Sequence, residues 1–251
     1  MSEQSMTSYF SDFLSAHLKG WLSNRGLLLF SEICNSTASM DACELEKETS
    51  PPARILLHVG CGPARKEHTG PGFQSDGWQE IRLDIDPNAH PDIVGTMLDM
   101  SAVASASVDA VFSSHNIEHL YPHEVPLALN EFQRVLKPGG FLVLTCPDLQ
   151  SVCQLIAEGL LTEAAYLAPV GPISPLDILY GHRPQLAAGN LYMAHHTGFT
   201  LATLMATLKE SGFGAVAGQR REAAFDLWVI ASMTLLPDAD LLALAALHLP
   251  N

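Results

Sequence analysis

Short apolar runs separated by polar loops recur along the chain from Arg54 onwards. The runs that predict strands are RILLHV, IRLDI, DIVGTM, VDAVFSS and FLVLTC, and the stretch VPLALNEFQRVL between the last two has helical spacing. Strands that alternate with helices or long crossovers form a parallel sheet covered on both faces. The pattern therefore predicts an α/β fold.

The two ends of the chain show different patterns. Near the C-terminus, LATLMATLKESGF predicts a helix closed at Gly212, and GAVAGQR and FDLWVIAS predict two strands. The apolar residues of 1–35 have near-helical spacing, whereas 36–53 are polar and end in a proline pair. We expect an N-terminal helical extension (1–35), a linker (36–53), one domain (54–234) and a C-terminal helical tail (235–251).

Composition limits the function. The 251 residues are 47% hydrophobic, enough for a packed core, and 27 acidic against 13 basic residues give a formal charge of −14. This charge repels a phosphate backbone, so we expect a small-molecule substrate and no nucleic acid. No apolar run is long enough to span a membrane and no secretory signal is recognisable, so we expect a cytoplasmic protein without a membrane partner. A homodimer formed through the terminal helices is compatible with this pattern.

The five cysteines form no C-x-x-C pair, and their odd number gives no disulfide framework. We expect reduced thiols.

Two strand ends carry the residues expected of a nucleotide site. In VGCGPA, Gly60 and Gly62 allow a tight turn and the close approach of a ligand to the main chain. Asp84, in LDIDP, follows Gly62 by 22 residues, close to the spacing at which a carboxylate meets ribose hydroxyls. Asp86 faces the same way along a strand, so either carboxylate could serve, and we favour Asp84.

The segments LHVGCGP, RLDIDP, GTMLDM, VDAVFSSHNIEHL and EFQRVLKPGGFLVLTCPD, taken together, resemble the class I S-adenosylmethionine-dependent methyltransferases. The resemblance covers about 54–233. It implies a doubly wound, seven-stranded, mostly parallel sheet with the last strand antiparallel. It further implies S-adenosylmethionine as cofactor and methyl transfer by in-line displacement to an O, N or S nucleophile.

The resemblance also assigns residues to the cofactor. Gly60 and Gly62 would pass under its methionine part, Asp84 would hold the ribose and Asp99 would face the adenine amino group. The main chain at Ser114 and His115 would border the sulfonium. The predicted cofactor-binding set is Gly60, Cys61, Gly62, Arg65, Asp84, Ile85, Asp99, Met100 and Ser114.

The sequence departs from the family pattern in two ways. Ala64 replaces a frequent third glycine, and the helix after the first strand is short or missing. Both changes affect the contacts to the cofactor's carboxylate, for which Arg65 is a candidate substitute.

The histidine-rich stretch SSHNIEHLYPHE contains His115, Glu118 and His119 in the H-x-x-E-H spacing of one class of zinc peptidases. That chemistry needs a long helix, whereas Pro122 and Pro126 interrupt this one, so we expect no stoichiometric structural zinc. The alternative that a divalent metal orients a substrate stays open. His119 either supports the cofactor loop from the core or takes part in catalysis, and His115 is the better candidate for substrate contact.

The long segment after the fifth strand, about 159–199, predicts a lid over the active site; the alternative is a proline-rich surface excursion. For substrate binding, this segment contributes Tyr180, His182, Arg183 and Tyr192. The predicted catalytic residues are His195 and His196 from this segment and His115 and His119 from the earlier loop. We expect His115, His195 and His196 to converge on one pocket that suits a polar acceptor. Two rivals remain: a catalytically silent relative that acts as a partner or scaffold, and a metal-dependent enzyme that uses the histidine cluster.

Overall fold

The computed structural model describes residues 53–250. The predicted N-terminal helical extension and nearly all of the linker lie outside the described residues. Among the helices that the structure describes, none is both long and apolar enough to cross a bilayer.

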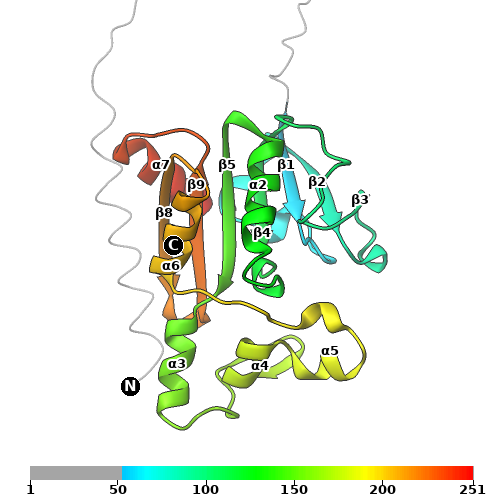
Figure 1. The fold of residues 1–251 in the computed structure, drawn as a ribbon, viewed down its shortest axis with the longest axis vertical. Coiled ribbons are helices and arrows are strands. Elements are labelled where there is room, and N and C mark those ends of the chain that lie inside the picture. Colours follow the sequence, from blue (N-terminus) through cyan, green and yellow to red (C-terminus); the bar gives the residue numbers. More distant parts are fainter. Residues whose placement is uncertain (1–52, 251) are drawn as a thin grey trace, which may run out of the picture. The chain divides into compact units, whose positions relative to one another are not determined.

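Seven strands form the central sheet (Figure 1). Their order is β3-β2-β1-β4-β5-β9-β8, and β9 alone runs in the direction opposite to the other six strands. The strands are β1 (Arg54–Val59), β2 (Trp78–Asp84), β3 (Ile93–Val94), β4 (Val108–Ser114), β5 (Leu136–Pro147), β8 (Ala215–Arg221) and β9 (Asp226–Ser232). The predicted fold class, a mostly parallel seven-stranded sheet with the last strand antiparallel, is confirmed.

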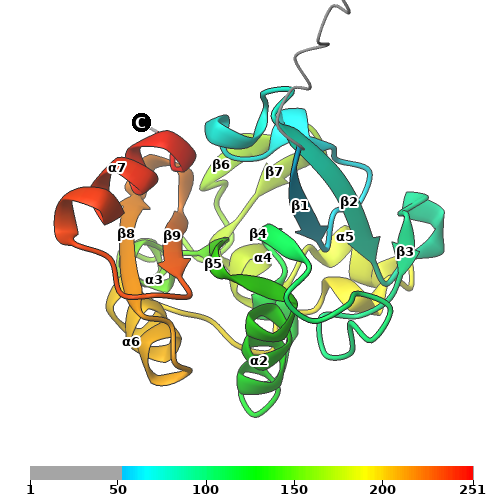
Figure 2. The same cartoon turned by 90° about the horizontal axis from the view of Figure 1, so that it is seen from above.

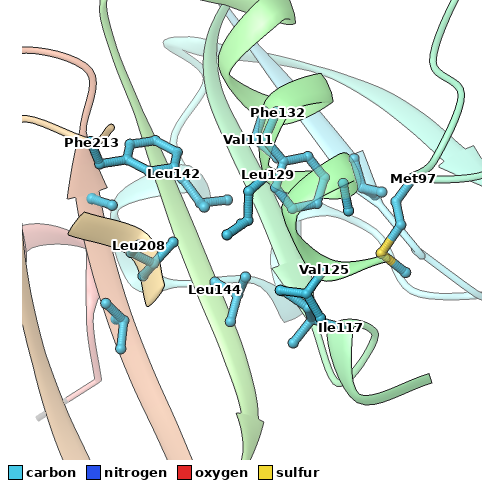
Figure 3. Close-up of a cluster of buried hydrophobic side chains, with 14 of the residues drawn as sticks. Met97, Val111, Ile117, Val125, Leu129, Phe132, Leu142, Leu144, Leu208 and Phe213 are labelled. Carbon is cyan, nitrogen blue, oxygen red and sulfur yellow. The ribbon is translucent and has the colours of Figure 1, made fainter. Parts of the chain in front are cut away.

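Helices cover both faces of this sheet, as Figure 2 shows from above. On one face lie α2 (Val125–Val135) and α6 (Leu201–Glu210), and on the other lies α7 (Asp238–His248). Apolar residues of α2 and α6 pack on β4 and β5 in the main core, where Phe132, Leu129 and Leu208 meet Leu142 and Leu144 (Figure 3). Because α2 is the next α-helix after β4, this packing fixes the loop between them at the carboxyl edge of the sheet.

The connection from β1 to β2, all of which lies within the described residues, contains no α-helix. It consists of loop and two short 3₁₀ turns, η2 (Lys66–His68) and η3 (Pro71–Phe73). The face that this connection leaves open is filled by α7, whose His248 packs against Phe73 with ring centroids 4.4 Å apart. A Cβ atom at Gly72 would lie 2.5 Å from Nδ1 of His248, so the turn and the C-terminal helix fit only with glycine there.

Beyond the carboxyl ends of the strands lies the segment between α3 (Leu149–Ala157) and α6 (Figure 1), which we call the lid. It contains the hairpin β6 (Tyr166–Ala168) and β7 (Gly171–Ile173), then α4 (Pro175–Tyr180), α5 (Arg183–Ala187) and the 3₁₀ turn η6 (Leu191–Met193). The amides of His196 and Thr197 both donate to the carbonyl of Glu118, at 2.8 and 3.2 Å. These bonds fasten the end of the lid to the loop after β4.

Candidate functional site

A cavity of about 550 Å³ opens at the carboxyl ends of β1, β2 and β4. In an open parallel sheet this edge is where ligands bind, next to the point at which the strand order reverses. Of the predicted site residues, those on the cavity wall are Gly60, Gly62, Asp84, Ile85, His115, His119, Tyr192 and His196. The fold therefore brings the glycine loop, the acidic strand end and part of the histidine cluster to one cavity.

The glycine loop after β1 needs its two glycines for different reasons. Gly60 has φ +66° and Gly62 has φ +50°, a region that other residues rarely adopt. A Cβ atom on Gly60 would also lie 2.2 Å from Nδ2 of Asn116. At Gly62, apart from the two adjacent residues, no heavy atom of residues 53–250 lies within 4 Å of that position. Gly60 thus allows the loop after β4 to pack closely, and Gly62 leaves open space along the cavity.

Asp84, at the end of β2, holds the glycine loop in place. Its Oδ2 accepts a hydrogen bond of 2.6 Å from the amide of Gly62, and its Oδ1 accepts one of 2.8 Å from the amide of Asp86. Each carboxylate oxygen keeps a further lone pair for a ligand donor. The Asp86 carboxylate also lies on the cavity wall, where its Oδ1 accepts from the amide and side chain of Asn88.

Arg82 lies two residues before the end of β2 and is buried. Its guanidinium donates to the carbonyls of Ala64 and Gly62 in the glycine loop and to those of Ala89 and His90 in the loop after β2. A planar fork of donors suits this bridging role better than a lysine would. Arg82 therefore ties together the two loops that border the cavity, in a region where no α-helix follows the glycine loop.

Five of the predicted cofactor residues do not reach the cavity wall, and two of these five lie in the core. Cys61 and Met100 are buried there. Burial raises the pKa of the Cys61 thiol to about 11, so this cysteine is no nucleophile.

Of the other three predicted cofactor residues, two lie at the surface and one forms a hydrogen bond within the sheet. Arg65 and Asp99 are exposed outside the cavity, and Asp99 accepts from the amide of Ser101. The hydroxyl of Ser114 pairs with that of Thr145 at 2.7 Å. The family spacing therefore does not by itself bring these side chains to the cavity.

The loop after β4 places His115 at the cavity in a left-handed conformation, with φ +48°. Its Nδ1 lies 3.5 Å from Oε1 of Glu118, whose side chain is buried. Burial acts to lower the pKa of His115, but the adjacent Glu118 carboxylate outweighs it and raises this pKa above its ordinary value. In the same loop, residues Ile117–His119 form one 3₁₀ turn, η5, rather than part of a long helix.

The other predicted catalytic histidines meet this loop from the lid. His195 lies against His119, with ring centroids 4.9 Å apart, and His196 stacks on Tyr121 at 4.1 Å. His115, His119 and His196 line the cavity, whereas His195 does not. His195 instead lies beside His119, and its burial lowers its pKa.

Of the four predicted substrate residues, only Tyr192 lines the cavity. Arg183 forms an ion pair with Asp177, 2.7 Å between Nε and Oδ1, which holds α4 and α5 together and the pKa of Asp177 well below its usual range. His182 precedes α5 as its N-terminal cap residue, and Tyr180 is exposed.

Arg82 and Asn116 are absent from the site residues that the sequence predicts. The signal for Arg82 is an arginine inside an apolar strand pattern, where a charge is rare unless it is bonded. Nothing in the sequence marks Asn116, because its role depends on its contact with Gly60 across two strands.

Sequence comparisons with known proteins agree with this geometry. Residues 57–144 match the family model described as a methyltransferase domain. The chain is 32% identical over 108 residues to the probable methyltransferase ltbC of Aspergillus luteorubrus, a match that covers 35% of this chain and 38% of that protein. The match thus spans less than half the length of this curated relative.

Solved structures also align with the chain. With 1,6-didemethyltoxoflavin-N1-methyltransferase of Burkholderia thailandensis the TM-score is 0.47 at 16% identity, covering 73% of this chain and 72% of that one. With a SAM-dependent methyltransferase of Methanosarcina mazei the TM-score is 0.48 at 17% identity, covering 78% of this chain and all of the other.

The strand order, the antiparallel β9 and the cavity at the switch point define a doubly wound nucleotide-binding fold. Within this fold, residues 57–144, which run from β1 into β5, match a methyltransferase domain.

Proposed function

We propose that the protein binds S-adenosylmethionine and transfers its methyl group to an O, N or S atom of a small molecule. The observation that carries this proposal is the cavity that unites Gly62 and Asp84 with His115 and His119. Its volume of about 550 Å³ falls in the range of ordinary small-ligand sites.

The residues present fit the cofactor. Gly62 leaves free space at the cavity, so a ligand can approach the main chain there. Asp84 keeps lone pairs for two ribose hydroxyls while its bonds to the Gly62 and Asp86 amides hold it in one orientation. Arg82 fixes the loop in the way a following helix would otherwise do. When bound, the cofactor supplies an electrophilic methyl group on a positively charged sulfur.

The chain's own part in the reaction is positioning and proton handling. His115 and His119 line the cavity from the loop after β4, and Tyr192 and His196 come from the lid. Holding an acceptor in line with the methyl group supplies most of the expected acceleration. An imidazole can take the proton of a hydroxyl acceptor or donate a hydrogen bond to it.

A small acceptor is favoured over a polymer. The formal charge of −14 disfavours nucleic acid, and the lid covers the strand ends at which an acceptor would enter. We still predict that the protein acts in the cytoplasm without a membrane partner. We also keep the prediction that two copies can pair through the terminal helices.

Calorimetry with the full chain and S-adenosylhomocysteine tests the binding step, and we expect one molecule bound per chain. A screen of candidate metabolites with methyl-labelled S-adenosylmethionine then tests transfer. Absence of binding would refute the proposal. Binding without transfer to any hydroxyl, amine or thiol in a broad panel would favour the catalytically silent alternative.

A further inference from the structure

Three side chains converge beside the cavity. Glu118 and His119 come from the turn after β4, and His195 comes from the end of the lid. One nitrogen or oxygen from each lies within 4.8 Å of the others. These segments are far apart along the chain, and the folding of the lid onto the turn after β4 brings them together.

The hydrogen bonds of the two imidazoles fix their tautomers. Nδ1 of His119 lies 3.0 Å from the carbonyl oxygen of Ala194, and Nδ1 of His195 lies 2.7 Å from that of Ile178. A carbonyl only accepts, so each Nδ1 carries the proton and donates it. In the neutral ring Nε2 then keeps a lone pair, and metal-binding histidines are commonly oriented by such a bond from their other nitrogen.

The side chain of Glu118 is buried without a hydrogen bond. Among residues 53–250, neither of its carboxylate oxygens has a hydrogen-bond partner. Nδ1 of His115 lies 3.5 Å from Oε1, a distance that allows a charge interaction but no good hydrogen bond. A buried carboxylate in this state is costly unless a cation compensates it.

A metal ion fits this arrangement better than a proton does. One ligand atom from each of the three groups lies near the same point, and a proton can bridge only two of them. A divalent ion can bind all three and keep open positions for a further ligand, as two histidines and one carboxylate do in known metal sites. The mixed nitrogen and oxygen donors favour zinc or a neighbouring transition metal over magnesium or calcium.

We propose that Glu118, His119 and His195 bind a divalent transition-metal cation, zinc in the first instance, at the wall of the cavity. His119 belongs to both the cluster and the cavity wall, so an open position of the ion would be accessible to a bound acceptor. Binding of a hydroxyl oxygen to the ion lowers the pKa of that hydroxyl, and its proton leaves to water. This role for the acceptor rests on the proposed function, whereas metal binding does not.

This site differs from the metallopeptidase pattern considered for the sequence. That pattern would use His115 and His119 from one helix, whereas here the second histidine is His195 from the lid. Packing of the lid onto the turn after β4 therefore completes the site.

Metal binding can be measured directly on the full chain after removal of bound ions with a chelator. Calorimetry with zinc should give about one ion per chain, and cobalt(II) should give visible absorption bands of a protein-bound ion. Glu118→Gln, His119→Gln and His195→Gln should each weaken zinc binding at least about 100-fold, since loss of a supporting partner alone typically costs about 10–100-fold. The matched control is His123→Gln, an exposed histidine shortly after His119, which should bind zinc as the wild type does.

Thermal unfolding separates loss of a ligand from loss of the fold. Zinc should raise the Tm of the wild type and of His123→Gln but not that of the three ligand variants, which should still unfold cooperatively in chelator. Zinc binding that survives all three substitutions, or no binding by the wild type, overturns the proposal. Binding of S-adenosylhomocysteine, measured on the same samples, reports separately on the proposed function.

Discussion

The amide of Gly62 donates a 2.6 Å hydrogen bond to Oδ2 of Asp84, which joins the glycine loop after β1 to the end of β2. The same carboxylate accepts from the amide of Asp86 through its other oxygen. One side chain thus orders two loops at the cavity and keeps lone pairs for a ligand.

Asp84→Ala should weaken binding of S-adenosylhomocysteine by about 1.5 to 3 kcal/mol, because it removes an ionised acceptor and frees the Gly62 amide. Calorimetry measures the change. Asp86→Ala is the comparison, since Asp86 also lies on the cavity wall. A larger loss in Asp86→Ala than in Asp84→Ala would move the ribose contact to Asp86.

Arg82→Lys should lower the free energy of unfolding by about 2 to 4 kcal/mol, because a lysine cannot serve the four carbonyls that the buried guanidinium reaches. Urea unfolding measures this loss, and cofactor affinity should fall with it. Arg65→Lys, on the exposed part of the same loop, should leave both unchanged. Equal stability of the two variants would contradict the role given to Arg82.

Gly60→Ala should destabilise the protein more than Gly62→Ala. Both substitutions put a side chain at positive φ, which costs about 1 to 2 kcal/mol, but only Gly60→Ala also collides with Asn116. Adding Asn116→Ala to Gly60→Ala should therefore recover part of the lost stability, a coupling that a double-mutant cycle measures. Strict additivity would refute the packing argument.

The stability of the protein should fall as the pH drops from about 6.5 towards 4. His248 is fully buried, and burial, followed by the charge of Arg54, lowers its pKa to about 4. Between the two pKa values the unfolded chain binds the extra proton, so lowering the pH from about 7 to about 5 should cost about 2 kcal/mol from this group. Urea unfolding at both pH values should show a smaller loss in His248→Leu than in the wild type, and equal losses would exclude His248 as the cause.

Local patterns in the sequence are enough for the sheet and for part of the cavity wall. The alternation of short strands with helices predicts a parallel sheet, and its strand ends place Gly60, Gly62 and Asp84 together. These features depend on periodicity and on residues close to the strand ends, so they can be recognised without coordinates. The missing helix after β1 is also visible, because its segment lacks helical spacing.

Other features depend on contacts between distant segments, and only the tertiary structure decided them. Arg82 reaches two loops, α7 fills the face left open after β1, and the lid returns His195 to Glu118 and His119. Asp99 has the family spacing but lies away from the cavity. A sequence specifies which residues are neighbours along a strand or helix, whereas packing decides which side chains from separate elements meet, and that is why the histidine cluster could be named but not assembled from the sequence.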